Sequence, residues 1–252
     1  MQFTIKRDSL LKSLTLVQGI IEKKNTLPIL SNVLLNAKDG KLLITATDLD
    51  LVFYDELSDI KIITEGSTTT SATILHDILR KISGNSDIKF DLKSENKLNL
   101  NTDNSDFNLL CLPIDNFPNF AENFENNEIS FNKSKLLSLL NKTKISISND
   151  DTRHYLNGVY LHLTESQNRT YLTAVATDSH RLSSSSIELE AGKTFHSLIL
   201  PKKTVFQLCS LLTETSDQLT MQTSENKIKF TLGKMKLISK AQMRLQVKLS
   251  FL

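Results

Sequence analysis

The spacing of apolar residues divides the chain into two kinds of segment. Apolar positions three and four residues apart form one face of a helix, whereas alternation of apolar and polar residues over about four to eight positions is typical of a half-buried strand. The first pattern predicts helices over 6–24, 72–83, 132–144 and 201–213. The second predicts strands over 3–6, 33–36, 41–48, 51–56, 60–64, 88–92, 97–101, 107–112, 129–131, 158–163, 171–178, 181–189, 196–200, 219–222, 227–232 and 235–240.

Two short motifs recur at the same distance along the chain. The triplet Ala-Thr-Asp at 46–48 returns at 176–178, and the stretch 94–98 returns as 224–228, in both cases 130 positions later. Two matches at one offset indicate an internal duplication, because a fixed period is the mark of repeated structural units. The 252 residues are therefore predicted to fold as two related domains, each large enough to bury its own core.

The predicted organisation is a first domain over 1–120, a linker over 121–127 and a second domain over 128–240. Closely spaced strands with two helices per copy favour an α+β fold, in which both helices pack on one face of antiparallel sheets. The last residues, 241–252, match nothing in the first copy. Their alternating apolar residues could pair as an added edge strand or aggregate.

Composition places the chain among ordinary globular proteins. It has 39% hydrophobic and 23% charged residues, no apolar run long enough for a membrane span, and no apolar core of a secretory signal at its start. Cys111 and Cys209 stand alone among apolar residues, which predicts two buried thiols in a reducing, cytoplasmic compartment.

Positive charge is concentrated in the predicted helices. The formal net charge is only +2, yet the four helices hold thirteen basic and three acidic residues, so the strands and loops are acidic in sum. Basic helices on a common surface would attract phosphate backbones without reading sequence. The alternative is that these side chains only solvate the outer helix faces. The pattern predicts DNA contacts by Lys12, Arg80, Lys81, Lys133, Lys135, Lys202 and Lys203.

Three aspartates at strand ends, Asp48, Asp50 and Asp178, raise the question of a bound metal. A metal site needs carboxylates that converge, and their distribution over two domains favours turn capping instead. Ser179 and His180 lie beside Asp178, but adjacent residues on a strand point to opposite faces and cannot form a catalytic triad. Glycine-rich phosphate loops and paired-cysteine motifs are absent from the sequence, so no catalytic residue, metal or cofactor is expected.

Four motifs together resemble the bacterial sliding clamp, the beta subunit of DNA polymerase III. They are Leu-Pro-Ile-Leu-Ser-Asn at 27–32, Ala-Thr-Asp-Leu at 46–49, Tyr-Leu-Asn-Gly at 155–158 and Ala-Thr-Asp-Ser-His-Arg-Leu at 176–182. The resemblance implies a non-enzymatic processivity factor, an accessory subunit of the holoenzyme, built as a homodimeric ring with basic helices facing duplex DNA. It also implies that peptides of the polymerase catalytic subunit and of the clamp loader bind in an apolar pocket.

The resemblance assigns roles to particular residues. Lys24 and Tyr155 match loop positions that contact DNA, and Phe107 and Leu109 match the edge strand that meets the neighbouring subunit. Ser179 stands where the family usually has glycine, which predicts a loop of different shape. The second-domain wall of the peptide pocket is matched by Leu156, Thr177, Ser179, His180, Arg181 and Leu182.

Family members continue into a third clamp domain, which the sequence after residue 240 does not resemble. Half of the peptide pocket and the partner of the Phe107 edge are therefore expected to be missing, ring closure is not expected, and DNA binding is expected to be weak. Two alternatives stay open. The first is an inert or partly functional clamp fragment, and the second is a metal-dependent enzyme that acts on nucleic acid through Asp48 or Asp178.

Overall fold

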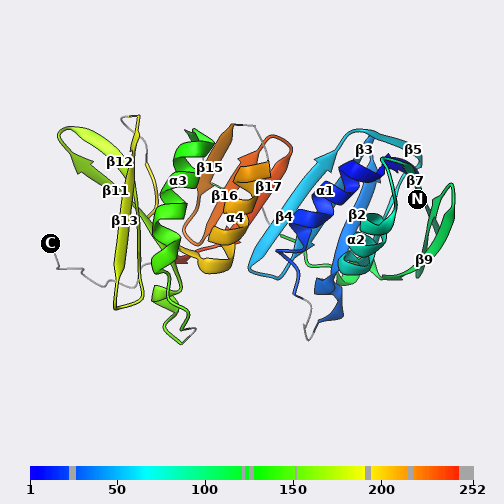
Figure 1. Ribbon diagram of the computed structural model, residues 1–252, viewed down its shortest axis with the longest axis horizontal. Helices are drawn as coiled ribbons and strands as arrows, with labels where there is room; N and C mark the ends of the chain where they lie inside the picture. Colours follow the sequence, from blue (N-terminus) through cyan, green and yellow to red (C-terminus); the bar gives the residue numbers. More distant parts are fainter. Residues whose placement is uncertain are drawn as a thin grey trace. The chain divides into compact units, whose positions relative to one another are not determined.

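The computed structural model describes residues 1–22, 27–120, 123–124, 128–150, 152–190, 194–214 and 218–243. They form two compact units, whose main segments are Met1–Ala121 and Glu122–Gly233 (Figure 1). In these described residues, no helix is long and apolar enough to cross a membrane.

The first unit packs two helices, α1 (Arg7–Val17) and α2 (Ala72–Lys81), against antiparallel strands and against each other. Phe3 and Phe90 stack in its core with ring centroids 4.7 Å apart. The strands follow the order β4-β3-β2-β6-β9-β8-β7-β1-β5. Their bounds are β1 Gln2–Lys6, β2 Asn32–Lys38, β3 Lys41–Thr47, β4 Leu51–Leu57, β5 Ile60–Thr64, β6 Gly66–Ser71, β7 Asp87–Ser94, β8 Lys97–Thr102 and β9 Ser105–Leu112, with 3-10 turns η1 Pro28–Ser31 and η2 Ile114–Asn116.

The second unit repeats this plan with helices α3 (Lys133–Thr143) and α4 (Lys202–Glu214), which lie side by side (Figure 1). Helix α3 packs on β12 and β13, and α4 packs on β11 and β14. The strands form two sheets, in the orders β10-β15-β16-β17 and β13-β12-β11-β14-β18. Their bounds are β10 Ile129–Phe131, β11 Gly158–Ser166, β12 Arg169–Thr177, β13 Leu182–Leu189, β14 Leu198–Pro201, β15 Leu219–Thr223, β16 Lys227–Leu232, β17 Met235–Lys240 and β18 Gln242–Met243, with 3-10 turns η3 Lys144–Ser146 and η4 His154–Leu156.

The predicted α+β class, with two helices and antiparallel sheets in each unit, is confirmed. Both cysteines are buried, as predicted, and burial raises the pKa of each thiol. One buried strand, β6, was not predicted, because its sequence is Gly-Ser-Thr-Thr-Thr-Ser and carries no apolar residue. Its Thr69 side chain accepts a hydrogen bond from Asn32 Nδ2 at 3.1 Å and donates one to the Leu112 carbonyl at 2.8 Å.

The duplication extends into strand register. In the first unit, Thr69 of β6 pairs with Leu112, and in the second unit, Ile199 of β14 pairs with Gln242, again at the offset of 130 residues. The start of the segment 241–252 thus occupies the position of the last strand of the first unit, although its sequence does not match. The pairing predicted for this segment is present at Gln242–Met243, and the remainder lies outside the described residues.

Candidate nucleic-acid and peptide interfaces

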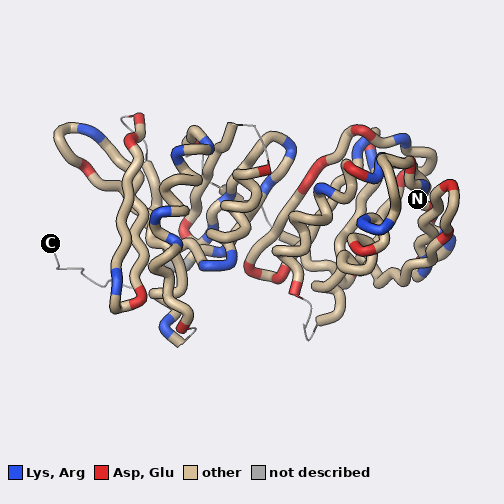
Figure 2. The backbone as a smooth tube through the Cα atoms, viewed as in Figure 1, with Lys and Arg blue, Asp and Glu red and all other residues tan. Residues whose placement is uncertain are grey.

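The second unit presents lysines on the outer side of its two helices, a surface that we call the α3–α4 face. Apolar residues such as Leu136, Leu139 and Leu208 hold the opposite sides of the helices in the core. Asn132 caps α3 by accepting from the backbone N–H groups of its first turn at 3.0 and 3.4 Å. Blue segments of the backbone tube mark basic residues along α3 and at the start of α4 (Figure 2). Its lysines are Lys133, Lys135, Lys142, Lys144, Lys202 and Lys203.

Two features of the α3–α4 face were not predicted from the sequence. The Lys144 ammonium lies over the ring of Phe206, 5.3 Å from its centroid. Phe206 is 48% exposed and Ile145 is 59% exposed, so apolar surface lies among the lysines. The sequence did contain a signal for this exposed apolar surface. Phe206 lies beside the buried stripe of the amphipathic helix α4, and an apolar residue in that position faces outward.

Two of the basic residues predicted to contact DNA from the first unit, Lys12 and Arg80, have acidic neighbours. Arg80 at the end of α2 lies 3.6 Å from Asp77, and both Arg80 and Lys81 are exposed. Lys12 is exposed on α1 above the buried Asp55. Burial raises the pKa of the Asp55 carboxyl, and the Lys12 ammonium opposes that rise. Lys24, predicted to contact DNA, lies outside the described residues.

Two loops of the same construction follow β3 and β12, and we call them the Thr-Asp loops (47–51 and 177–181). In each, the threonine hydroxyl accepts from the N–H two residues on, at 2.9 Å in the first loop and 3.2 Å in the second. In the first loop, Asp48 Oδ1 accepts from the N–H groups of Asp50 and Leu51 at 3.0 and 2.7 Å. In the second loop, Asp178 Oδ1 accepts from the N–H groups of His180 and Arg181 at 3.0 and 2.9 Å. Leu49 and Ser179, at the third position, have φ of 80° and 79°.

The Ser179 backbone has the left-handed conformation that glycine favours, with nearly the same φ as Leu49 in the first loop. Whether serine in place of the family's glycine changes the loop stays a prediction. The Thr-Asp hydrogen bonds are common to both loops, which explains why the backbone keeps this shape with either side chain.

The aspartates of these loops serve as caps, as the sequence predicted. Hydrogen bonds from the backbone N–H groups of Arg181 and His180 are the main reason that the pKa of Asp178 falls to about 2, and the Arg181 guanidinium adds to them through Nε at 3.0 Å. In the described part of the chain, no group of three or more His, Cys, Asp or Glu side chains could hold a metal ion. Asp48 and Asp178 are thus engaged in loop structure.

Five of the six residues predicted to form a peptide-binding wall lie in the second Thr-Asp loop or directly after it, and Leu156 lies on η4. Leu182, which is 64% exposed, begins β13. Leu156 ends η4, a turn tied to the start of α4 by the hydrogen bond from Lys202 N to Asn157 O at 3.1 Å. Its neighbour Tyr155, predicted to contact DNA, is also exposed. The Thr177 hydroxyl donates to the carbonyl of Arg181 at 2.8 Å.

Arg153 joins η4 to the second Thr-Asp loop. Its Nε donates to Asp150 Oδ2 at 2.8 Å and its Nη1 donates to Ser179 Oγ at 3.0 Å. A guanidinium presents its donors in a fixed plane, so two acceptors on different loops fix its orientation. Sequence reasoning missed Arg153, because its two partners lie 3 and 26 residues away along the chain.

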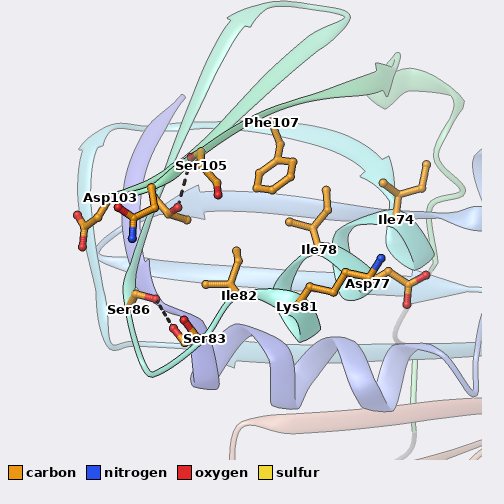
Figure 3. Close-up of a pocket in the computed structure, with 12 residues that line it drawn as sticks. Ile74, Asp77, Ile78, Lys81, Ile82, Ser83, Ser86, Asp103, Ser105 and Phe107 are labelled. Carbon is orange, nitrogen blue, oxygen red and sulfur yellow. Dashed lines mark hydrogen bonds between the residues drawn. The ribbon is translucent and has the colours of Figure 1, made fainter.

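A cleft of about 620 Å³ separates α2 from the β8–β9 hairpin. Phe107, predicted to meet a neighbouring subunit, points into it together with Ile78 and Ile82 of the α2 segment (Figure 3). Leu109 lies on the same strand but is only 5% exposed, so its side chain packs inside the first unit. Of the two residues assigned to this interface, Phe107 therefore lines a cleft that a partner could enter, whereas the Leu109 side chain is buried.

Both units match domains of one known protein family. Residues 1–121 fit the model of the DNA polymerase III beta subunit, N-terminal domain, and residues 130–241 fit that of its central domain. The protein named Beta sliding clamp of Caulobacter vibrioides (strain NA1000 / CB15N) is 36% identical over 242 residues, which is 95% of this chain and 65% of the relative. That of Escherichia coli (strain K12) is 33% identical over 233 residues, 92% of this chain and 62% of the relative.

Solved structures of sliding clamps have the same fold as this chain. Caulobacter crescentus pol III beta superposes with a TM-score of 0.91 at 35% identity, covering 96% of this chain and 66% of that one. The DnaN sliding clamp from Bartonella birtlesii, bound to griselimycin, gives 0.90 at 35% identity, covering 96% and 65%. The chain thus spans about two thirds of the length of the proteins it matches. It belongs to the DNA polymerase III beta subunit family, the family of the bacterial sliding clamps.

Proposed function

We propose that this chain is a sliding-clamp processivity factor, which holds duplex DNA through basic helices and tethers the replicative polymerase without catalysing a reaction. The observation that carries the proposal is the α3–α4 face, with its six lysines, in a unit that belongs to the clamp family. Membership in that family favours DNA over other polyanions. The proposed place of action is the cytoplasm, where the bacterial chromosome lies.

The proposed contact with DNA is electrostatic. Lysine ammonium groups on helix faces neutralise phosphates and displace counterions, which gives affinity that depends on salt and not on base sequence. A surface that reads no bases can slide, because each step along the duplex exchanges one phosphate for an equivalent one. In this proposal, Lys12, Arg80, Lys81 and Tyr155 add contacts to those of the α3–α4 face.

Partner proteins are proposed to bind at the second Thr-Asp loop. Leu156 and Leu182 offer apolar contacts to a short peptide, and His180 and Arg181 border them with polar groups. The expected partners are peptides of the polymerase catalytic subunit and of the clamp loader. Support comes from the match of these residues to the pocket wall of the clamp family, together with the exposure of the Leu182 side chain.

The Phe107 cleft is the proposed subunit contact. An apolar side chain of a second clamp subunit would fill the space between Phe107 and Ile78. This contact would close a ring only with a partner that supplies the third clamp domain. A closed ring would make retention on DNA depend on topology, because it leaves a linear duplex by its ends but cannot leave a covalent circle.

Retention assays test this function. The chain is incubated with the clamp loader and nicked circular or linear duplex, and bound protein is measured after a wash at high salt. Salt-resistant retention on circles only indicates a closed ring. Equal, salt-sensitive binding to both forms indicates an open clamp that holds DNA by charge alone. Absence of duplex binding at low salt contradicts the proposed function.

A further inference from the structure

In the first unit, the chain that follows the last strand packs back onto the turn η1. This stretch, the η2 segment (113–117), contains η2 and ends at Phe117. Phe117 forms one buried cluster with Ile29 and Leu30 of η1, and Leu34 and Leu112 pack against that cluster. Ile29 and Leu30 are only 8% and 1% exposed. The η2 segment thus covers an apolar surface of its own unit.

The duplication locates the counterpart of this surface in the second unit. The turn η1 precedes β2 as η4 precedes β11, so Ile29 and Leu30 correspond to Tyr155 and Leu156. The sequences agree at this point, because Leu-Ser-Asn-Val at 30–33 is matched by Leu-Asn-Gly-Val at 156–159. The counterpart of the covered surface is therefore η4 and the start of β11.

Strand pairing extends the match to the other side of the surface. The pairing of β2 with β6 and of β6 with β9 recurs in the second unit as the pairing of β11 with β14 and of β14 with β18. In this repeated pattern, Tyr160 takes the place of Leu34, and Gln242 takes the place of Leu112.

The surface is covered in the first unit and open in the second. Among the described residues of the second unit, Tyr155 is 55% exposed, and Leu156 and Tyr160 are partly exposed. We call these three residues the η4 surface. Burial of apolar area is favourable, and the first unit shows that this surface accepts an apolar side chain from the segment after its last strand.

The chain itself supplies a segment at the matching place. Residues 244–252 follow β18 as the η2 segment follows β9. Phe117 stands five residues after the paired end of β9, and the residue five positions after Gln242 is Val247, flanked by Leu245 and Leu249. In an extended stretch, alternate residues share one side. These three apolar residues would then face the η4 surface together.

We infer that the segment 244–252 docks on the η4 surface of its own chain, with Val247 in the position that Phe117 has in the first unit. The docked segment covers Leu156, one end of the proposed peptide-binding wall, so partner peptides compete with it for the wall. The docking rests on the duplicated fold, and the competition rests on the proposed function.

Two single substitutions in the full chain test the docking. Val247→Asp sets a carboxylate against the η4 surface, and Gln246→Asp, the matched control, adds the same charge to the other side of the segment. Hydrogen–deuterium exchange of the backbone amides at 154–157 is measured by mass spectrometry at two protein concentrations, and thermal melting confirms folding. We expect exchange about fivefold faster in Val247→Asp and unchanged in Gln246→Asp.

The docking has two outcomes that overturn it. One is equal exchange in Val247→Asp, in Gln246→Asp and in the unaltered chain. The other is protection that disappears when the unaltered chain is diluted, because the occupant is then a second copy. A chain that ends at Met243 removes the segment altogether and must show the same faster exchange as Val247→Asp.

Peptide affinity tests the competition separately. A fluorescein-labelled peptide that contains the clamp-binding segment of the polymerase catalytic subunit is titrated with each variant, and anisotropy is measured. A segment that covers the wall about nine-tenths of the time lowers the apparent affinity about tenfold. We therefore expect about five- to tenfold tighter binding in Val247→Asp and no change in Gln246→Asp.

The two measurements separate the possible failures. Equal peptide affinity in Val247→Asp and in the unaltered chain overturns the competition. Absence of peptide binding in every variant overturns the proposed function of the wall instead, and the exchange data then still decide whether the segment docks.

Discussion

At the scale of single residues, the Thr-Asp loops show how a short sequence sets backbone geometry. One threonine hydroxyl and one aspartate carboxylate satisfy three backbone N–H groups in each loop. The sequence could predict the capping role of Asp178, because aspartate favours turns for this reason. It could not predict the bond between Arg153 and Ser179, which depends on two loops meeting in space.

The Asp178 carboxylate is expected to titrate near pH 2, below its ordinary value of 3.8. Since the folded-state pKa is lowered, the stabilising contribution of the ionised group is fully present above pH 3.8 and is lost as pH falls toward about 2. Carbon-13 NMR of the side-chain carboxyl measures this directly. A midpoint at 3.8 would show that the loop hydrogen bonds do not form in solution.

Ser179→Ala is expected to release the Arg153 side chain, because the Ser179 hydroxyl is one of its two acceptors. The cost is about 0.5–1.5 kcal/mol, as for a single hydrogen bond. The readout is faster solvent exchange of the Arg153 Nη1–H protons in NMR spectra, since Nη1 is the donor to Ser179. Leu49→Ala is the matched control, since it alters the same position of the other loop, where φ is also positive. Unchanged exchange in Ser179→Ala would contradict the proposed link between η4 and the loop.

At the scale of elements, hydrophobic pattern located the helices and most strands but not β6. Strands such as β16 alternate apolar and polar residues and were predicted from that alternation. In β6 the buried positions are threonines, whose hydroxyls are paired with neighbouring strands. A polar strand can be buried when each group finds a partner, and single-sequence patterns do not record those partners.

Thr69→Val tests this explanation for β6. Valine has the shape of threonine without the hydroxyl, so the Asn32 amide and the Leu112 carbonyl each lose a partner. We expect a loss of about 1–3 kcal/mol in the free energy of unfolding, measured by urea denaturation. Thr70→Val, where the hydroxyl makes one longer bond of 3.2 Å to the Leu110 carbonyl, is the control and should lose less. Equal losses would count against Thr69 as the link between β2, β6 and β9.

At the scale of the whole molecule, the sequence predicted the duplication and the basic helices, and the resemblance to the clamp family implied the function. The offset of 130 residues recurs in motifs, in loop geometry and in strand register. The excess of lysine on helices could be counted from the sequence.

The central claim is that lysines of the α3–α4 face bind phosphates without reading bases. The direct measurement is the affinity of the variant Lys133→Glu, Lys135→Glu, Lys202→Glu and Lys203→Glu for two duplexes of unrelated sequence, as a function of salt. We predict equal weakening on both duplexes and a slope of log K against log salt flatter by about 3 to 4. An unchanged slope, or weakening on one sequence only, would contradict the account.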